Sequence, residues 1–210
     1  MDAVVFRAWI VAAAEIIEAN RDHLTQLDAA IGDADHGINL ARGFTAVLGA
    51  LDAASPEAPG AILTLTGNTL ISRVGGASGP LYGTAFRRAG KALGDAADVD
   101  LPALSAALDA ALAGVQQLGA AREGDKTMVD ALAAATRAFG KAIAEGAAES
   151  EALAALAEAA EAGAEATISM QALKGRASYL GPRSVGHEDP GAVSTALILG
   201  ALRDAARAGR

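Results

Sequence analysis

The chain has 210 residues and a formal net charge of −8; 52% of its residues are hydrophobic, but only 3% are aromatic. This acidic balance argues against direct binding of nucleic acid, which needs a basic surface. The absence of cysteine excludes disulfide bonds, thiol catalysis and cysteine-ligated metals. No apolar run reaches the roughly 18 residues of a membrane span, and no secretory signal pattern begins the sequence, so we expect a cytoplasmic protein without a membrane segment.

Apolar residues recur at three- and four-residue steps along most of the chain, which predicts α-helices. Asp100, Ser150 and Asp189 are expected helix N-caps, because helical patterns follow each of them. No alternating pattern typical of a strand is present. We therefore predict one all-α domain, residues 1–210, with about eight antiparallel helices in an up-and-down barrel or bundle. The expected helices lie near residues 5–16, 38–52, 59–74, 80–94, 101–118, 128–143, 150–171 and 190–207.

Four segments interrupt the helical pattern, namely residues 28–39, 75–80, 119–128 and 172–191. Alternate connections of an up-and-down bundle lie at the same end. We therefore expect these four segments to meet at one rim of the bundle.

The first of these segments places the carboxylates of Asp28, Asp33 and Asp35 within eight residues. Spacings of five and seven do not fit one helical face, so we predict a helix end followed by a folded-back loop. Carboxylates this close repel one another unless a cation neutralises them, and oxygen ligands favour Mg²⁺ or Ca²⁺. The alternative is a solvated loop, or aspartates that only cap the next helix, for which Asp35 with Gly37 would suffice.

Two further segments suit a phosphate. Residues 75–80, Gly-Gly-Ala-Ser-Gly-Pro, precede a predicted helix, where free amides and the Ser78 hydroxyl are able to bind an anion. An ordinary turn between helices explains the same glycines. The long segment 172–191 carries Lys174, Arg176 and Arg183, which either pair with phosphate or remain solvated at the surface. Together, the acidic, glycine-rich and basic segments are typical of a site for a nucleoside di- or triphosphate.

Five motifs in this order resemble the L subunit of dihydroxyacetone kinases: residues 27–39, 74–81, 124–128, 174–181 and 186–191. The resemblance implies an eight-helix barrel with the nucleotide at one rim, and two Mg²⁺ ions held by Asp28, Asp33 and Asp35. It implies that Arg176 is catalytic, and that Met128, a core residue by its helical pattern alone, packs near the adenine. The implied nucleotide contacts are His36, Gly37, Ile38, Asn39, Ala77, Ser78, Gly119, Met128, Arg176, Asp189, Pro190 and Gly191.

The resemblance further implies a phosphotransferase subunit that acts on dihydroxyacetone held by a separate K subunit. Bound ADP would serve as a coenzyme, rephosphorylated by a phosphohistidine of an M subunit with phosphoenolpyruvate as the ultimate donor. The alternatives are a subunit of an ATP-dependent dihydroxyacetone or erythrulose kinase, and a nucleotide-state sensor that binds a transcription regulator. A di-iron helical bundle is disfavoured, because the sequence has no Glu-x-x-His pair. The glycine segment also differs from that of the related fatty acid kinases.

Overall fold

Residues 1–209, the part of the chain that the computed structural model describes, form nine α-helices and two 3₁₀ helices, and no β-strand. This confirms the all-α prediction. The α-helices are α1 (Ala3–Ala19), α2 (Arg21–Ile31), α3 (His36–Ala54), α4 (Pro59–Arg73), α5 (Ser78–Leu93), α6 (Leu101–Gly119), α7 (Met128–Ala144), α8 (Glu149–Ala166) and α9 (Pro190–Ala208). The 3₁₀ helices are η1 (Thr167–Ser169) and η2 (Arg176–Ser184).

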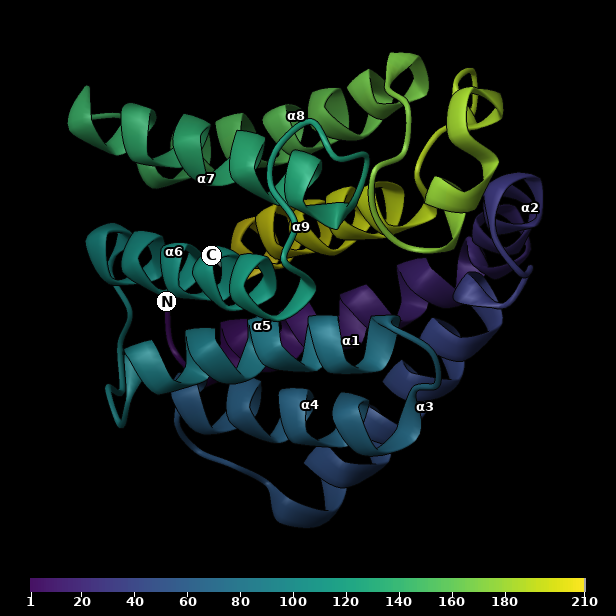
Figure 1. Ribbon diagram of the computed structural model, residues 1–210. Helices are drawn as coiled ribbons and strands as arrows, with labels where there is room; N and C mark the ends of the chain where they lie inside the picture. Colours follow the sequence, from purple (N-terminus) through teal and green to yellow (C-terminus); the bar gives the residue numbers. More distant parts are fainter. Residues whose placement is uncertain (210) are drawn as a thin grey trace.

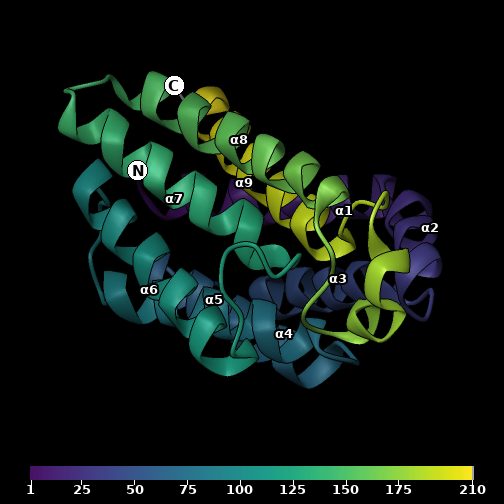
Figure 2. The same cartoon turned by 45° about the horizontal axis from the view of Figure 1, so that its top comes forward.

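Eight of these helices close a ring around one apolar core (Figure 1). Helices α3, α4, α5 and α6 pack in sequence, α7 packs on α8, and α9 lies between α8 and α1. Helix α1 contacts α3 and α6 contacts α7, so the two halves join into a barrel. The turned view in Figure 2 shows α8 and α9 running side by side along one half, with α4, α5 and α6 along the other.

The composition explains how the helices pack. The ring of Trp9 packs against two of the few aromatic side chains: it lies 5.9 Å from the ring of Phe6 and 5.7 Å from that of Phe86. Elsewhere small residues let the helix backbones approach closely. A Cβ atom added to Gly67 of α4 would lie 2.5 Å from the carbonyl oxygen of Gly83 in α5. A larger side chain would therefore push these two helices apart.

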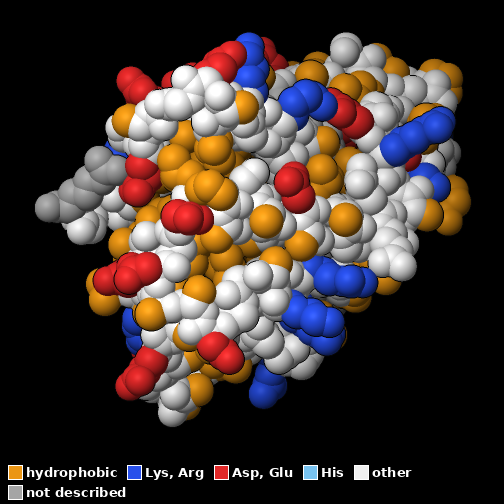
Figure 3. Space-filling model, turned by 90° about the vertical axis from the view of Figure 1, so that its left-hand side faces the viewer, with side chains coloured by type: hydrophobic (Ala, Val, Ile, Leu, Met, Phe, Trp, Pro, Cys, Tyr) orange, Lys and Arg blue, Asp and Glu red, His pale blue; other side chains and the backbone are white. Residues whose placement is uncertain are grey.

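The two ends of the barrel differ. The loops that follow α2 and α4, and the long segment between α8 and α9, lie at the right-hand end in Figure 1. Both termini lie toward the opposite end. The space-filling view of that opposite end shows apolar side chains near its middle, with acidic side chains mostly on one side and basic ones mostly on the other (Figure 3).

Several helix boundaries differ from the sequence-based predictions. Helix α2 was not predicted as a separate element: it is mostly polar, and a single residue, Asn20, separates it from the end of α1. The expected cap at Ser150 is wrong, because α8 begins at Glu149 and its first turn is closed by Glu151, whose side chain accepts the amide of Ala148. Helix α8 also ends at Ala166 rather than near residue 171.

Other expectations at helix ends are confirmed. Asp100 accepts the amide of Ala103 at 2.8 Å, and Asp189 accepts the amide of Ala192 at 2.8 Å, so both aspartates cap their helices. Within residues 1–209, no helix combines the length and apolar character needed to cross a membrane.

Candidate functional site

The four segments that interrupt the helical pattern meet at one rim of the barrel, as predicted. Residues from all four line a single pocket there. The first residues of four helices are part of its lining: His36 of α3, Ser78 of α5, Met128 of α7 and Pro190 of α9. Each helix start carries the positive end of the helix dipole. The pocket is therefore electrostatically suited to a multiply charged anion.

The three predicted carboxylates converge at this pocket. Asp28 lies in the last turn of α2, and Asp33 and Asp35 lie in the loop before α3, where Ala34 adopts a left-handed φ of 62°. One side-chain oxygen from each carboxylate lies within 4.8 Å of the other two. An all-oxygen set of this kind fits a hard divalent cation such as Mg²⁺.

Asp28 also fixes the shape of this loop. Its Oδ2 atom accepts the backbone amides of Asp35 at 2.8 Å and of His36 at 3.1 Å, so Asp28 satisfies the first amides of α3. The side chain of Asp35 makes no capping bond. Asp35 therefore does not cap α3, and the aspartate that bonds the first amides of this helix is Asp28. Gly32 is required beside Asp28, because a Cβ atom there would lie 2.0 Å from Asp28 Oδ1.

The glycine-rich segment 75–80 forms the turn between α4 and α5. Gly76 has a φ of 66°, and Ala77 and Ser78 bring the start of α5 to the pocket. The Ser78 hydroxyl lies 3.1 Å from Nδ1 of His36. The segment is a turn between two helices, as the simpler interpretation of its glycines expects. It also lines the pocket opposite the acidic loop, where an anion-binding role remains a prediction.

Positive charge enters the pocket from the segment between α8 and α9. Lys174 and Arg176 both contribute to the lining, and Arg176 Nε lies 3.0 Å from Asp33 Oδ2. Arg183 is exposed outside the lining. Part of this segment forms the 3₁₀ helix η2, so it is more regular than the loop expected from its glycines.

Lys126 is a fully buried lysine at the edge of the pocket. Its Nζ atom donates to the carbonyl oxygen of Thr167 at 2.6 Å and also to that of His187. Burial lowers the pKa of Lys126, while the charges of Asp189, Asp130 and Glu188 oppose that shift. Lys126 therefore joins the start of α7 to both ends of the segment between α8 and α9.

Burial perturbs two further groups. It lowers the pKa of His36, against the opposing charges of Asp28 and Asp35. It raises the pKa of Asp189 to about 7, although Lys126 and the amide bond from Ala192 act in the opposite direction.

Most of the predicted site residues lie together. The pocket is lined by Asp28, Asp33, Asp35, His36, Ala77, Ser78, Met128, Arg176, Asp189, Pro190 and Gly191. Met128 is also part of the apolar core, as its helical pattern predicts.

Four predicted residues lie outside this lining. Gly37 packs against α2, where an added Cβ atom would lie 2.0 Å from the carbonyl oxygen of Arg21. Ile38 is half exposed in a hollow beside α2. Asn39 is buried and accepts a hydrogen bond from Arg42 at 2.8 Å. Gly119 ends α6 near Leu81.

Sequence reasoning missed several residues of the pocket. Tyr82 lies four residues after Ser78 and therefore on the same face of α5, a spacing that was available as a signal. At position 126 the sequence shows only a lysine between Asp125 and Thr127, ahead of a predicted helix. Nothing in that local pattern indicates a buried ammonium group.

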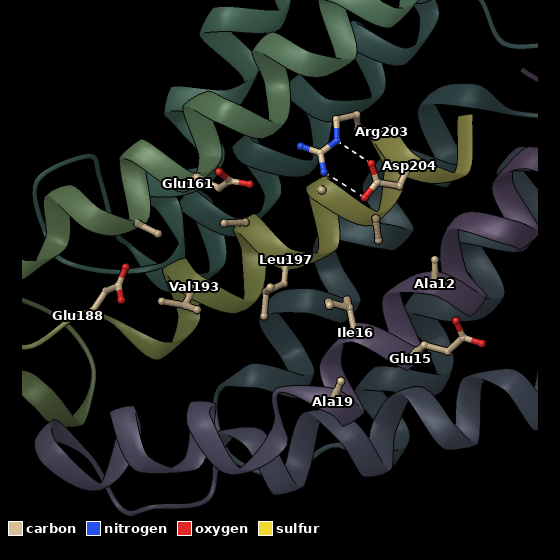
Figure 4. A pocket seen from close by; sticks show the side chains of 14 residues that line it. Ala12, Glu15, Ile16, Ala19, Glu161, Glu188, Val193, Leu197, Arg203 and Asp204 are labelled. Atoms are coloured by element: carbon tan, nitrogen blue, oxygen red, sulfur yellow. Dashed lines mark hydrogen bonds and ion pairs between the residues drawn. The ribbon is translucent and has the colours of Figure 1, made fainter. Parts of the chain in front are cut away.

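A second hollow, of about 590 Å³, runs along the outer face of α9 between α1 and α8 (Figure 4). Its floor is apolar, and Glu15, Glu161 and Glu188 lie at its edges. Asp204 there is already paired with Arg203 at 2.7 Å. The convergent carboxylates and helix starts belong to the rim pocket, which is therefore the candidate site.

A helical barrel with a carboxylate triad and four helix starts at one rim is suited to binding a divalent metal ion together with a phosphorylated ligand. Comparison with known proteins agrees. The chain belongs to the DAK2 domain family, whose profile matches residues 30–204.

Similar proteins extend over the whole chain. It is 43% identical over 199 residues to the ADP-binding subunit DhaL of the PEP-dependent dihydroxyacetone kinase of Escherichia coli, covering 95% of each chain. It is 39% identical over 194 residues to the corresponding subunit of the PTS-dependent kinase of Lactococcus lactis, covering 92% of this chain and 93% of the relative.

The fold is also that of a solved kinase. The dihydroxyacetone kinase of C. freundii, in complex with AMP-PNP and Mg²⁺, aligns with a TM-score of 0.72 and 30% sequence identity. The match covers 97% of this chain and 34% of that longer kinase.

Proposed function

We propose that this chain is the ADP-binding subunit of a phosphoenolpyruvate-dependent dihydroxyacetone kinase. The observation that carries the proposal is the convergence of four helix starts on the three carboxylates at one rim. The near full-length relatives named as ADP-binding subunits of such kinases support it. Residues 1–210 act in this proposal as one nucleotide-binding domain.

In this proposal, Asp28, Asp33 and Asp35 would hold two Mg²⁺ ions. Mg²⁺ held there would neutralise phosphate charge and so favour phosphoryl transfer. The positive dipole ends of α3, α5, α7 and α9 favour the nucleotide phosphates at this rim. Met128 offers an apolar, adaptable surface for the base.

Arg176 is the proposed catalytic residue. Its guanidinium lies at the mouth of the pocket beside Asp33 and is 70% exposed, so it is able to pair with a phosphoryl group without being pulled out of the core. A charge aimed at the transferring group stabilises the negative charge of the transition state. Lys174 adds to the positive potential from the same segment.

The reaction needs partners, which belong to the proposal as well. Dihydroxyacetone is held on a separate K subunit, and ADP remains on this chain as a coenzyme. A phosphohistidine of an M subunit rephosphorylates ADP, and phosphoenolpyruvate is the ultimate donor. The proposed location is the cytoplasm, where ADP and phosphoenolpyruvate are available.

A second candidate is an ATP-dependent kinase. The triokinase/FMN cyclase of Rattus norvegicus is 40% identical over 182 residues, but the match covers only 31% of that protein. The nucleotide released from freshly purified protein on denaturation separates the two functions. About one ADP per chain, retained through gel filtration with Mg²⁺, supports the coenzyme mechanism; an empty protein that exchanges ATP readily supports the ATP-dependent kinase.

Calorimetric titration with ADP in the presence of Mg²⁺ tests the site itself. Asp33→Asn removes one charge from the carboxylate triad, and Asp109→Asn removes one from an exposed position on α6. We expect only Asp33→Asn to abolish Mg²⁺-dependent binding, while both variants keep their helical circular dichroism. Unchanged affinity in Asp33→Asn would overturn the metal assignment.

A further inference from the structure

The hollow along the outer side of α9 is lined by apolar faces of two helices. Ala12, Ile16 and Ala19 line it from α1, at steps of four and three residues, and so lie on one face of that helix. Val193 and Leu197 line it from α9, four residues apart. Figure 4 shows Ile16 and Leu197 pointing into the space between the two helices. Both side chains are partly exposed there.

Helix α9 is apolar on its outer face as well as on its inner one. The inner face buries Ile198, Leu199 and Leu202 in the core of the barrel. The outer face, with Val193 and Leu197, forms the floor of the hollow. A helix that is apolar all round is typical of a helix covered on every side. Within residues 1–209, the outer face of α9 remains partly open.

Gly200 lies in this floor, in the interior of α9. Glycine weakens the interior of a helix relative to alanine, so it needs a compensating reason. At Gly67 the reason is the close approach of Gly83 in α5. At Gly200 an added Cβ atom would have no neighbour within 4 Å, so packing inside the described chain does not require glycine there. The position leaves room for a group from another molecule.

The charges around the hollow are mainly negative. Glu15 of α1 and Glu161 of α8 are exposed on opposite sides of it, and Glu188 lies at its edge near the start of α9. Arg203 is the one cation of the lining, and it is paired with Asp204. An occupant with basic side chains on both flanks of an apolar face therefore complements this surface.

The walls also determine which kind of chain fits. The hollow lies along helices, whose backbone groups are hydrogen-bonded within each helix except at its ends. An extended segment pressed against these walls would lose the water on its own amides and find no partners in exchange. A helix satisfies its own backbone, and amphipathic helices bind apolar grooves in this way. A second copy of the same surface would instead bring like charges together.

We propose that this hollow is a docking groove for an amphipathic helix of a partner protein. The apolar side chains of that helix lie along α9, and its lysine or arginine residues lie beside Glu15 and Glu161. Gly200 lets one of its apolar side chains approach the backbone of α9. The hollow shares no lining residue with the rim pocket, so the inference goes beyond the proposed function and does not depend on it.

A designed peptide serves as the probe. A fluorescent peptide of about 18 residues, long enough to form a helix, carries leucine on one face and lysine on both flanks. Its counterpart carries glutamate in place of lysine. Fluorescence anisotropy without nucleotide measures the affinity of each peptide for the full chain. We expect the lysine peptide to bind with a helical circular dichroism spectrum, and the glutamate peptide not to bind.

Gly200→Leu fills the floor of the groove and should weaken binding of the lysine peptide about tenfold or more. Gly49→Leu is the matched control, because Gly49 is a helix glycine with equally open surroundings but lies in α3, outside the groove. It should leave the affinity unchanged. Both variants should keep their helical circular dichroism, since leucine is a better helix former than glycine.

The acidic flank is tested separately. Glu161→Gln should weaken the lysine peptide about fivefold, as expected for the loss of one exposed ion pair. Glu57→Gln makes the same change in net charge at an exposed position between α3 and α4, and should have no effect. This pair of variants keeps the proposal testable if Gly200→Leu does not fold.

Several results would overturn the proposal. The first is equal binding of the lysine peptide by Gly200→Leu and Gly49→Leu, or binding weaker than about 1 mM by the unmutated protein. The second is equal affinity for the glutamate peptide, or a bound peptide that is not helical. The third comes from sedimentation: a dimer of the unmutated protein that Gly200→Leu dissociates would assign the hollow to a second copy of this chain.

Discussion

Arg176 and Asp33 form an ion pair across the mouth of the rim pocket, with Nε and Oδ2 3.0 Å apart. The contact joins the 3₁₀ helix η2 to the carboxylate triad. The side chains are 70% and 36% exposed, and an ion pair this accessible to water contributes at most about 1 kcal/mol to stability. The position of Arg176 is therefore better explained by binding chemistry than by folding.

Replacement of Arg176 tests that interpretation. Arg176→Ala should slow phosphoryl transfer by about two orders of magnitude, because a charge that stabilises the transition state is lost. The melting temperature should stay close to that of the unmutated protein. Arg183→Ala, at an exposed arginine of the same segment, is the control and should retain transfer. A collapse in melting temperature with normal turnover per folded molecule would make Arg176 a structural residue.

The barrel helices could be predicted from local sequence patterns, because each of them buries one apolar face. Helix α2 could not be predicted in this way, since only Leu24, Asp28 and Ile31 of its eleven residues are buried and it has no apolar stripe. The common rim was predictable from the alternation of chain direction. The 3₁₀ helix η2 was not, because glycine and proline signal a turn without specifying its hydrogen bonds.

The candidate site could be predicted from the sequence only in part. Asp28, Asp33 and Asp35 were recognisable because closely spaced carboxylates among apolar residues repel one another unless a cation neutralises them. The hydrogen bond between Tyr82 and Ser194 depends on how α5 and α9 meet in space, 112 positions apart in sequence, and no local spacing encodes it. Neighbours in a motif also face different ways: His36 lines the pocket, whereas Gly37 packs on α2.

That packing predicts a large cost for a single methyl group at Gly37. Gly37→Ala would place a Cβ atom 2.0 Å from the carbonyl oxygen of Arg21 and 2.6 Å from Thr25 Oγ1, so α2 must shift. We expect a loss of about 2 kcal/mol or more in the free energy of unfolding, measured in urea.

Gly49→Ala is the matched control in the same helix, α3. An added Cβ atom at Gly49 has no neighbour within 4 Å. This variant should gain up to about 1 kcal/mol, because alanine is the better helix former. Equal effects at Gly37 and Gly49 would contradict the close packing of α2 on α3.

Lys126 is expected to be essential for stability. Lys126→Met removes the two hydrogen bonds to the carbonyl oxygens of Thr167 and His187. The Thr167 oxygen keeps the amide of Met170 at 3.1 Å, whereas the His187 oxygen loses the lysine as its donor. The substitution also removes a positive charge that interacts with Asp130 and Asp189. We expect a loss of about 3 kcal/mol in the free energy of unfolding in urea.

Lys141→Met is the control for Lys126→Met, because Lys141 is an exposed lysine with an ion pair of 3.9 Å to Glu145. It should change the free energy of unfolding by less than about 1 kcal/mol. If the two substitutions cost the same, Lys126 does not hold the segment between α8 and α9 to α7.

Asp189 should make stability depend on pH in an unusual direction. Burial raises its pKa to about 7 from an ordinary value of 3.8, so between these values the native carboxyl holds a proton that the unfolded chain has released. The native state then binds more protons than the unfolded state, and the contribution of Asp189 to stability falls as pH rises from about 4 to 7. The total fall is at most about 4 kcal/mol.

Asp189→Asn isolates this effect, since asparagine still caps α9 through its amide oxygen but does not titrate. Urea unfolding at intervals from pH 4 to 8 gives the free energy of unfolding of both proteins. The difference between unmutated protein and Asp189→Asn should decline with rising pH across this window and level off above it. A difference that instead grows with pH would mean that Asp189 is ionised in the folded protein, held so by Lys126, and its pKa would then lie below its ordinary value.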